Sequence, residues 1–203
     1  MKAGIVGLPN VGKSTLFNCL SNTKAQSANF PFCAIEPNHS IINVPDKRLI
    51  TLQEIVNPEK LIPATVEIVD IAGLVKGASK GEGLGNKFLA NIRETDAIIH
   101  VLRCFDNDNI THVDGSVDPI RDKEIIDIEL QLKDLESLNN RHEKVSRTVK
   151  SGDKEAAKEK EVLNQAISFI ESSNNVRSID LDEDDFNKYL KPLQLITSKP
   201  VLY

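Results

Sequence analysis

Runs of apolar residues alternate with helical patterns over the first hundred residues of the chain. The runs predict four strands: a first that includes residues 5–6, and three more at 41–44, 65–69 and 97–102. A helix through Leu16, Phe17 and Leu20 is predicted after a glycine-rich turn, and a second helix is predicted at about 86–94. Strands that alternate with helices predict strand–helix–strand units and a largely parallel sheet, and runs that are apolar throughout predict a sheet covered on both faces.

From residue 118 to about residue 173, good helix formers with a heptad-like spacing replace the strand pattern. Four apolar residues step by three, four and three positions, which places them on one helical stripe: Ile125, Ile128, Leu132 and Leu135. The triplet Ser-Gly-Asp at 151–153 interrupts the pattern, which resumes over 163–170. These features predict an antiparallel helical hairpin with its tip near Gly152.

The last thirty residues return to a mixed pattern. An acidic stretch at 180–185 precedes a short predicted helix, and residues 199–203 resemble the opening of another buried strand. Since a sheet protein rarely finishes inside a strand, we expect the chain to be a truncated part of a longer protein. The predicted domains are the first part of an α/β domain at 1–119, a helical insertion at 120–175 and a return to the first domain at 176–203.

The composition is that of a globular protein with a modest negative charge. Apolar residues make up 40% and charged residues 27% of the 203 positions, which excludes global disorder. The 25 basic and 30 acidic residues give a net charge of −5, which excludes attraction of the whole chain to nucleic acid or anionic membrane. Residues 141–160, with seven Lys and Arg against four Asp and Glu, are either a contact for an anionic partner or a solvated helix face.

Cysteine and histidine usage predicts neither a disulfide framework nor a structural zinc site. Cys19, Cys33 and Cys104 are odd in number and widely spaced, and no CxxC or Cys/His cluster occurs in the sequence. The amino terminus runs straight into a predicted strand, which leaves no room for a signal peptide, and no apolar run approaches membrane-spanning length. We therefore expect a soluble cytoplasmic protein with reduced thiols and no membrane partner.

The strongest chemical motif is GLPNVGKS at 7–14, which matches GxxxxGK[ST] between a predicted strand and a predicted helix. Its glycines let backbone N–H groups converge on phosphate oxygens, and the helix N-terminus adds a favourable dipole. Lys13 brings a positive charge to the β- and γ-phosphates, and Ser14 offers a hydroxyl to Mg²⁺. The motif predicts a phosphate-binding loop, or P-loop, for a nucleoside triphosphate.

A second motif, DIAG at 70–73, ends the third predicted strand. Asp70 is placed to hold Mg²⁺ through water, and the N–H of Gly73 is placed to sense the γ-phosphate. Ser14 and Asp70 are therefore the predicted metal residues. The residues predicted to bind the nucleotide are Asn10, Val11, Gly12, Lys13, Ser14, Thr15 and Gly73.

Together with further segments, these motifs carry a family resemblance. The segments are GLPNVGKS at 7–14, NFPFCAIEP at 29–37, the glycine-rich run at 70–86, RCFDNDN at 103–109 and DGSVDP at 114–119. They resemble the YchF subfamily of Obg-related P-loop NTPases, also called Obg-like ATPases, over essentially the whole chain. The resemblance implies an α/β G-domain, with a mostly parallel sheet flanked by helices, that carries an inserted antiparallel helical hairpin or coiled coil.

The position after DIAG bears on catalysis. Ras-like proteins place there a glutamine that orients the attacking water, whereas this chain has Leu74, which cannot hydrogen-bond to water. Hydrolysis therefore needs another water-positioning group, and we expect it to be slow. His112, on a predicted loop after Asn109, is the catalytic candidate because a neutral imidazole accepts a hydrogen bond from water. The alternative is an ordinary exposed loop histidine.

Two expectations about cations come from resemblance alone. Resemblance to other NTPases that lack the glutamine gives Asn10 a role in holding a K⁺ that neutralises charge in the transition state. The family's first switch has a threonine where this chain has Ala34, which offers no hydroxyl to Mg²⁺. Ala34 is therefore not among the predicted metal ligands.

The resemblance also implies a function. The family's base-reading motif, NxxE, disfavours guanine, so ATP is expected over GTP, although this motif would follow Tyr203. The leading hypothesis is a nucleoside-triphosphate-hydrolysing switch in translation or stress regulation, with ribosome or RNA as partner. The alternative is a nucleotide-gated scaffold or RNA-binding module with negligible turnover. A phosphotransferase fits less well, because the DIAG motif and the glycine-rich run that follows it are typical of switches.

Overall fold

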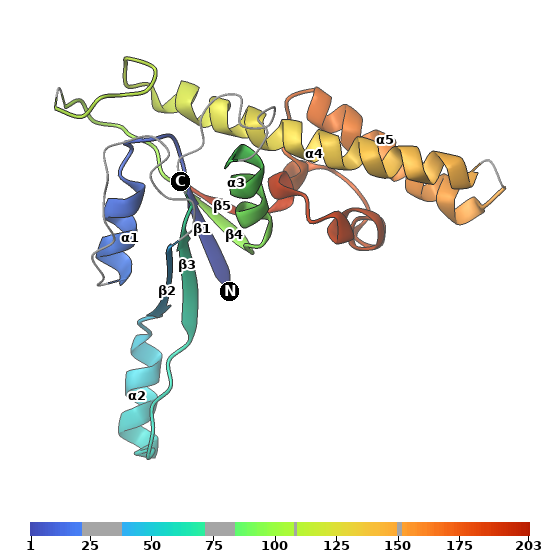
Figure 1. Cartoon of the computed structure of the whole chain (residues 1–203). Coiled ribbons are helices and arrows are strands. Elements are labelled where there is room, and N and C mark those ends of the chain that lie inside the picture. Colours follow the sequence, from blue (N-terminus) through green and yellow to red (C-terminus); the bar gives the residue numbers. More distant parts are fainter. Residues whose placement is uncertain (22–37, 72–83, 108, 150–151) are drawn as a thin grey trace.

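The computed structural model describes residues 1–21, 38–71, 84–107, 109–149 and 152–203 (Figure 1). Its centre is a five-stranded sheet of order β2-β3-β1-β4-β5. The strands are β1 (Lys2–Val6), β2 (Asn38–Asn43), β3 (Thr65–Asp70), β4 (Ala97–His100) and β5 (Val201–Leu202). β1 runs parallel to β3 and β4, and β4 runs parallel to β5, whereas the edge strand β2 is antiparallel to β3. The predicted α/β fold with a largely parallel sheet is confirmed.

Helices cover both faces of the sheet and extend beyond it (Figure 1). The α-helices are α1 (Lys13–Ser21), α2 (Lys47–Val56), α3 (Leu84–Arg93), α4 (Pro119–Val149), α5 (Lys154–Glu171) and α6 (Glu183–Asp185). Four further turns are η1 (Val176–Ser178), η2 (Phe186–Leu190), η3 (Lys191–Leu193) and η4 (Ile196–Ser198). α1 packs through Phe17 on Ala3 and Ile68, whereas α3 and the first half of α4 pack on the opposite face around Val69 and Ile98.

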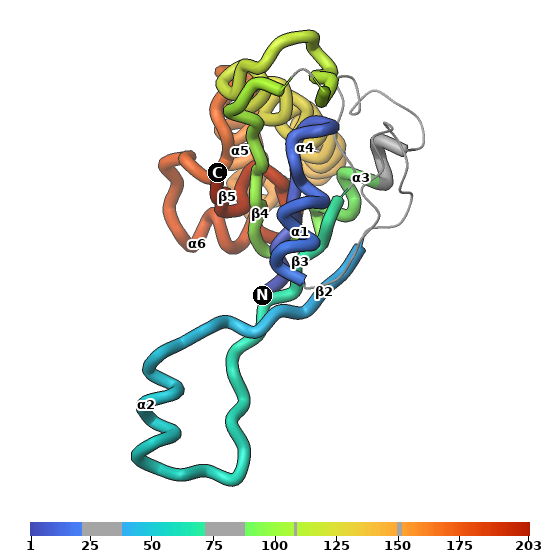
Figure 2. The backbone as a smooth tube through the Cα atoms, turned by 90° about the vertical axis from the view of Figure 1, so that its left-hand side faces the viewer, coloured from blue at the N-terminus to red at the C-terminus, as the bar shows by residue number. Residues whose placement is uncertain are grey.

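Helix α2 projects away from the sheet on the connection between β2 and β3 (Figure 2). The side chain of Asp46 accepts the N–H of Arg48 at its start, and Asn57 ends it in a left-handed conformation with φ 45°. None of the residues of α2 is buried. This helix was not predicted from the sequence, although Leu49, Leu52 and Val56 recur with helical spacing. The capping residue Asp46 was a second available indication.

The long helices α4 and α5 pack against each other as the predicted hairpin (Figure 1). α4 ends at Val149, and Asp153 caps α5 by accepting the N–H groups of Glu155 and Ala156. Arg141 on α4 and Glu159 on α5 form an ion pair of 2.6 Å between the two helices. The chain turns between these two helices, and Gly152, near which the tip is predicted, lies in the turn.

The predicted apolar stripe of α4 is wrong at two of its four positions. Ile128 is 51% exposed and Leu132 is 38% exposed. The buried apolar residues are Ile126, Leu130, Leu138 and Val145. A heptad spacing assumes one partner along the whole helix, but α4 has two partners in succession. Its first half packs in the core beneath the sheet, and its second half packs on α5.

The segment after α5 packs on the hairpin before the chain returns to the sheet. Val176, Tyr189, Leu190 and Leu195 share one apolar cluster with the second half of α4 and with α5. Ile196 is the next buried apolar residue, and it belongs to the core beneath the sheet. The predicted boundary between residues 175 and 176 therefore falls at the start of a segment that packs on the helices.

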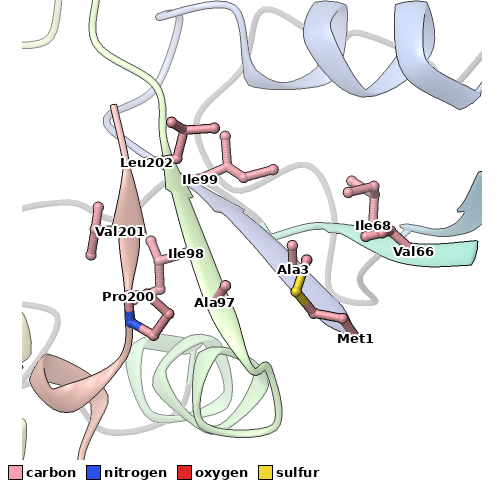
Figure 3. Close-up of a pocket in the computed structure, with 10 residues that line it drawn as sticks. All are labelled: Met1, Ala3, Val66, Ile68, Ala97, Ile98, Ile99, Pro200, Val201 and Leu202. Carbon is pink, nitrogen blue, oxygen red and sulfur yellow. The ribbon is translucent and has the colours of Figure 1, made fainter. Parts of the chain in front are cut away.

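A shallow apolar hollow of about 260 Å³ lies on the sheet (Figure 3). Its lining comes from β1, β3, β4 and β5 together with the residues just before them, and it includes Met1, Val66, Ile99, Pro200 and Leu202. Met1 and Pro200 precede parallel strands, which places the hollow toward the amino ends of those strands. The P-loop follows the carboxyl end of β1, so the hollow is not the nucleotide site.

Candidate functional site

The P-loop follows β1 directly, as the sequence predicts, and leads into α1. Gly7 has φ 150°, and a Cβ at this position would lie 2.5 Å from the backbone oxygen of Val101. Gly12 has φ 104°, which other residues rarely adopt, so both motif glycines are required by the backbone. Asn10 is also left-handed, with φ 62°. The turn therefore has the strained geometry of an anion-binding loop at a helix N-terminus.

The predicted nucleotide-binding residues occupy this turn with different exposures. The side chain of Val11 is buried in the core, so only its backbone N–H is available to a phosphate. Gly12 and Thr15 are exposed, while Asn10 and Ser14 are half-buried. Gly73 lies outside the described residues, as do Leu74 and Ala34, so the predictions made for these three positions stay predictions.

Lys13 is buried, and its Nζ donates a hydrogen bond of 2.7 Å to the backbone oxygen of Leu8. Burial lowers the pKa of Lys13 from 10.5 to about 8, and the nearby carboxylate of Asp70 opposes this effect. A buried ammonium group whose hydrogen bond in the described part of the chain goes to one backbone oxygen is poorly compensated. An anion that enters the loop would therefore interact strongly with Lys13.

Ser14 and Asp70, the two predicted metal residues, are in direct contact. The hydroxyl of Ser14 donates a hydrogen bond of 2.7 Å to Oδ2 of Asp70. The other carboxylate oxygen, Oδ1, is buried and has no hydrogen-bond partner among the described residues. Burial raises the pKa of Asp70, while the Ser14 hydroxyl and Lys13 act in the opposite direction. An uncompensated carboxylate oxygen beside a hydroxyl fits a Mg²⁺ site, since Mg²⁺ prefers hard oxygen ligands.

The loop that carries His112 is fixed by a buried arginine. Arg103, 2% exposed, follows β4, and its guanidinium donates to the backbone oxygens of Phe105, Asn107 and Ile110 at 2.9 to 3.1 Å. Arg103 was not among the functional residues predicted from the sequence. A charged residue directly after an apolar strand was the available indication, because such a residue must find several partners when it is buried.

The P-loop and this second loop are joined by a hydrogen bond. Nδ2 of Asn10 donates to the backbone oxygen of Thr111 at 3.2 Å. The contact places the residue before His112 beside the P-loop, as a catalytic role for His112 requires. The predicted role of Asn10 in holding K⁺, which would use its amide oxygen, stays a prediction.

His112 itself is only 7% exposed, which excludes the alternative of an exposed loop histidine. Its Nε2 lies 2.9 Å from Oδ2 of Asp122, and its Nδ1 accepts the backbone N–H of Asp114 at 3.2 Å. Asp122, in the first turn of α4, is 1% exposed and also accepts from the guanidinium of Arg121 at 3.0 Å. Both ring nitrogens of His112 thus have protein partners, and its part in catalysis stays a prediction.

His112, Asp114 and Asp122 carry metal-ligand atoms that lie within 4.8 Å of one another. The carboxylate of Asp122 already accepts from Arg121, and a guanidinium beside the carboxylate disfavours a second cation. We therefore interpret the group as a hydrogen-bond network. Asp122 was not predicted from the sequence, because nothing in the residues around it distinguishes it from other acidic residues in a first helical turn.

Among the helices of the described residues, none is both long and apolar enough to cross a membrane.

Comparison with protein families gives a match over residues 2–147 to the family described as 50S ribosome-binding GTPase. Among curated proteins, the chain is 54% identical over 202 residues to "Ribosome-binding ATPase YchF" of Haemophilus ducreyi and 55% identical over 203 residues to the protein of that name from Bacillus subtilis. Each alignment covers 100% of this chain and 55% of the relative. The chain thus spans about half the length of the curated relatives it matches.

A solved structure shows the same fold over the whole chain. The structure described as the Schizosaccharomyces pombe YchF GTPase superposes with a TM-score of 0.80 at 39% sequence identity. The superposition covers 100% of this chain and 55% of that one. The agreement confirms the expected G-domain, in which a long helix, α4, leads from the sheet into the inserted helices.

Proposed function

Because the chain belongs to the family of 50S ribosome-binding GTPases, and within it to the Obg-like YchF group, we propose that it is a switch that hydrolyses nucleoside triphosphates and acts on the ribosome. The observation that carries the proposal is the contact between Ser14 and Asp70 beside the P-loop, which leaves one buried carboxylate oxygen without a partner among the described residues. A triphosphate with Mg²⁺ would supply the missing interactions.

In this proposal the P-loop binds the triphosphate through the N–H groups at its turn and at the start of α1. Lys13 turns its ammonium group from the backbone oxygen of Leu8 to the β- and γ-phosphates. Ser14 and Asp70 hold Mg²⁺, which would neutralise the charge that develops on the phosphate oxygens. The backbone N–H of Gly73 would sense the γ-phosphate.

Hydrolysis in this proposal is slow and depends on His112. Leu74 cannot orient the attacking water, so the acceptor must come from elsewhere. The loop of His112 is held beside the P-loop by the Asn10–Thr111 hydrogen bond, which supports His112 as that acceptor. Both nitrogens of its ring have hydrogen-bond partners in the protein, so the attacking water must replace one of these partners. This requirement is consistent with slow turnover.

For the nucleotide and the cations, we propose ATP over GTP, with Mg²⁺ and K⁺. The curated relatives are named ATPases, whereas the family is described as GTPases. The preference for ATP therefore rests on the relatives. The proposed role of K⁺ rests on Asn10, whose left-handed conformation places its amide at the bend of the P-loop.

For the partner, we propose the ribosome, with RNA as the component in contact. The relatives are named ribosome-binding, and the tip of the α4–α5 hairpin carries the local excess of basic residues at 141–160. Some of this charge is neutralised within the protein, because Arg141 pairs with Glu159 and Lys158 pairs with Asp185. The contact would therefore rest on the remaining basic residues, such as Lys144 and Arg147. A cytoplasmic location follows from a ribosomal partner.

A nucleotide-gated scaffold with negligible turnover is the second candidate, favoured by the two occupied nitrogens of His112. Measurement of product formation at saturating ATP separates the two functions. A switch that hydrolyses ATP gives multiple turnovers, whereas a scaffold gives tight binding without appreciable product.

The binding site is tested by titration of ATP and GTP with and without Mg²⁺. We expect Asp70→Asn to remove most of the gain in affinity that Mg²⁺ provides, because the uncompensated carboxylate is lost. Asp184→Asn, the same change on an exposed residue of α6, should leave this gain intact. An unchanged Mg²⁺ dependence in Asp70→Asn would contradict the proposed site.

A further inference from the structure

The hydrogen bonds around His112 define which ring nitrogen carries the proton. The backbone N–H of Asp114 lies 3.2 Å from Nδ1 and can only donate, so Nδ1 must be the acceptor. A neutral ring with an acceptor at Nδ1 carries its proton on Nε2. Nε2 lies 2.9 Å from a carboxylate oxygen of Asp122, which can only accept when it is ionised. The two contacts therefore agree on one tautomer.

Asp122 is held firmly enough to impose this tautomer. It is 1% exposed in the first turn of α4, and its second oxygen accepts from Arg121. Arg121 is in turn fixed by Ser116, whose hydroxyl accepts at 2.9 Å and whose backbone oxygen accepts at 2.6 Å. The carboxylate is thus paired on both oxygens, and the pairing that compensates its burial also fixes its orientation.

We propose that Asp122 is a positioning residue for hydrolysis, which keeps the proton of His112 on Nε2 and presents the Nδ1 lone pair to the attacking water. The inference rests on the proposed role of His112 and specifies which of its atoms acts. The Asp114 contact is the longer of the two, at 3.2 Å against 2.9 Å, and it is the one that water replaces.

The chemical step balances with these groups. The water oxygen forms a bond to the γ-phosphorus while the bond from that phosphorus to the β–γ bridging oxygen breaks, and the electron pair leaves with the nucleoside diphosphate. The proton of the water passes to Nδ1 of His112, and the imidazolium that results is stabilised by the carboxylate of Asp122. The inorganic phosphate and the proton then leave, which restores the neutral ring.

The position of Asp122 in the fold supports a role in catalysis for its hydrogen bond with His112. The backbone oxygen of Thr111, next to His112, accepts from Asn10 of the P-loop, and Asp122 lies in the first turn of α4, the helix that extends toward the hairpin tip. His112 therefore lies between the P-loop and α4. A ring released from Asp122 would lose its orientation relative to the P-loop, while the P-loop itself would keep its contacts to the phosphates.

The first test is kinetic. Asp122→Asn retains the size of the side chain but can donate to Nε2, which favours the wrong tautomer; the same change in serine proteases lowers kcat about 10⁴-fold. We expect kcat for ATP to fall at least tenfold, with KM and nucleotide affinity changed less than threefold. Asp106→Asn is the matched control, because it removes a charge from an exposed aspartate of the same loop that has no part in the proposed step. It should keep kcat within twofold.

His112→Ala separates this inference from the proposed function. If His112→Ala lowers kcat and Asp122→Asn does not, the role of Asp122 is overturned while that of His112 stands. If neither variant lowers kcat, both roles are overturned. If both act as proposed, Asp122→Asn added to His112→Ala should have no further effect on kcat, since the carboxylate acts through the ring. A further loss in the double variant would contradict the inference.

The decisive part of a second test uses the unmodified protein, so it does not depend on whether a variant folds. Two-bond nitrogen–proton couplings in ¹⁵N-histidine-labelled protein show which ring nitrogen carries the proton. We expect the Nε2–H tautomer for His112 in the unmodified protein, and a shift toward the Nδ1–H form in Asp122→Asn but not in Asp106→Asn. A ring protonated on Nδ1 in the unmodified protein would overturn the inference regardless of the kinetic result.

Discussion

The side-chain amide of Asn10 donates a hydrogen bond of 3.2 Å to the backbone oxygen of Thr111. This contact joins the P-loop to the loop that carries His112 across 101 positions of sequence. The amide nitrogen of Asn10 is thus bonded to the second loop, and its oxygen is the atom that would bind the proposed K⁺. One substitution tests both.

We expect Asn10→Gly to abolish stimulation of ATP hydrolysis by K⁺ and to lower kcat about tenfold. Glycine adopts the φ of 62° without strain, so this change removes the amide and leaves the turn intact. The measurement is turnover in K⁺ and in Na⁺ at equal ionic strength, with ATP affinity as the control for the turn. Equal turnover of the unmodified protein in the two salts would exclude the K⁺ role.

The charge of Lys13 predicts a pH dependence of nucleotide binding. Its pKa in the folded protein is about 8, because burial disfavours the charged form. Above pH 8 the free protein carries a neutral lysine, and a bound triphosphate draws a proton back to it. We therefore expect ATP affinity to fall as the pH rises from 8 to 10, by up to tenfold for each pH unit.

Calorimetry in buffers of different ionisation enthalpy measures this proton uptake directly. We expect an uptake that approaches one proton above pH 8 and disappears below pH 7. For stability the sign is opposite: the unfolded chain, with a lysine pKa of 10.5, binds more protons than the folded one between pH 8 and 10.5, so this group adds stability as the pH rises through that range. Affinity that does not change with pH would contradict the lowered pKa.

Local motifs predicted the position of the P-loop turn, because its backbone geometry is encoded within eight consecutive residues. Gly7 and Gly12 adopt backbone angles that favour glycine, and Ser14 and Asp70 meet as the strand order requires. The environment of His112 could not be predicted in this way. Its burial depends on Arg103 and Asp122, and the burial of those residues follows from how the loop folds back on α4.

Local sequence also did not predict which residues of the helical hairpin are buried. A spacing of three and four residues correctly predicted a long helix and its turn, because both depend on local propensity. It could not predict that α4 changes partner along its length, which leaves Ile128 exposed and buries Ile126 instead. Sequence periodicity identifies a helical face, but the face that is buried depends on the elements that pack against it.

Arg103 provides a prediction for the stability of the His112 loop. Arg103→Lys keeps the positive charge but cannot reach all three backbone oxygens that the guanidinium contacts. We expect a loss of about 2 to 3 kcal/mol in the free energy of unfolding, measured with urea, because buried acceptors are left unpaired. Arg147→Lys, the same change on an exposed position of α4, should cost less than about 0.5 kcal/mol.

Asp134 links the hairpin to the sheet and gives the last prediction. Asp134 lies in α4 and is fully buried. Its carboxylate accepts hydrogen bonds from the backbone N–H groups of Ile196 at 2.8 Å and Thr197 at 2.7 Å, two residues that shortly precede β5. In Asp134→Asn, one oxygen still accepts, but the new amide group faces the second N–H as a donor. We expect hydrogen exchange at these two amides to become at least tenfold faster and the free energy of unfolding to fall by about 1 to 3 kcal/mol.

The exposed Asp184→Asn variant in α6 is the matched control, and it should leave both measurements unchanged. The exchange rates matter more than the stability, because they identify where the structure loosens. Faster exchange limited to Ile196 and Thr197 would mean that α4 holds the entry to β5 through this carboxylate alone. Faster exchange throughout the sheet would mean that the fold as a whole depends on it. Unchanged exchange at both amides would show that Asp134 does not hold α4 to the sheet.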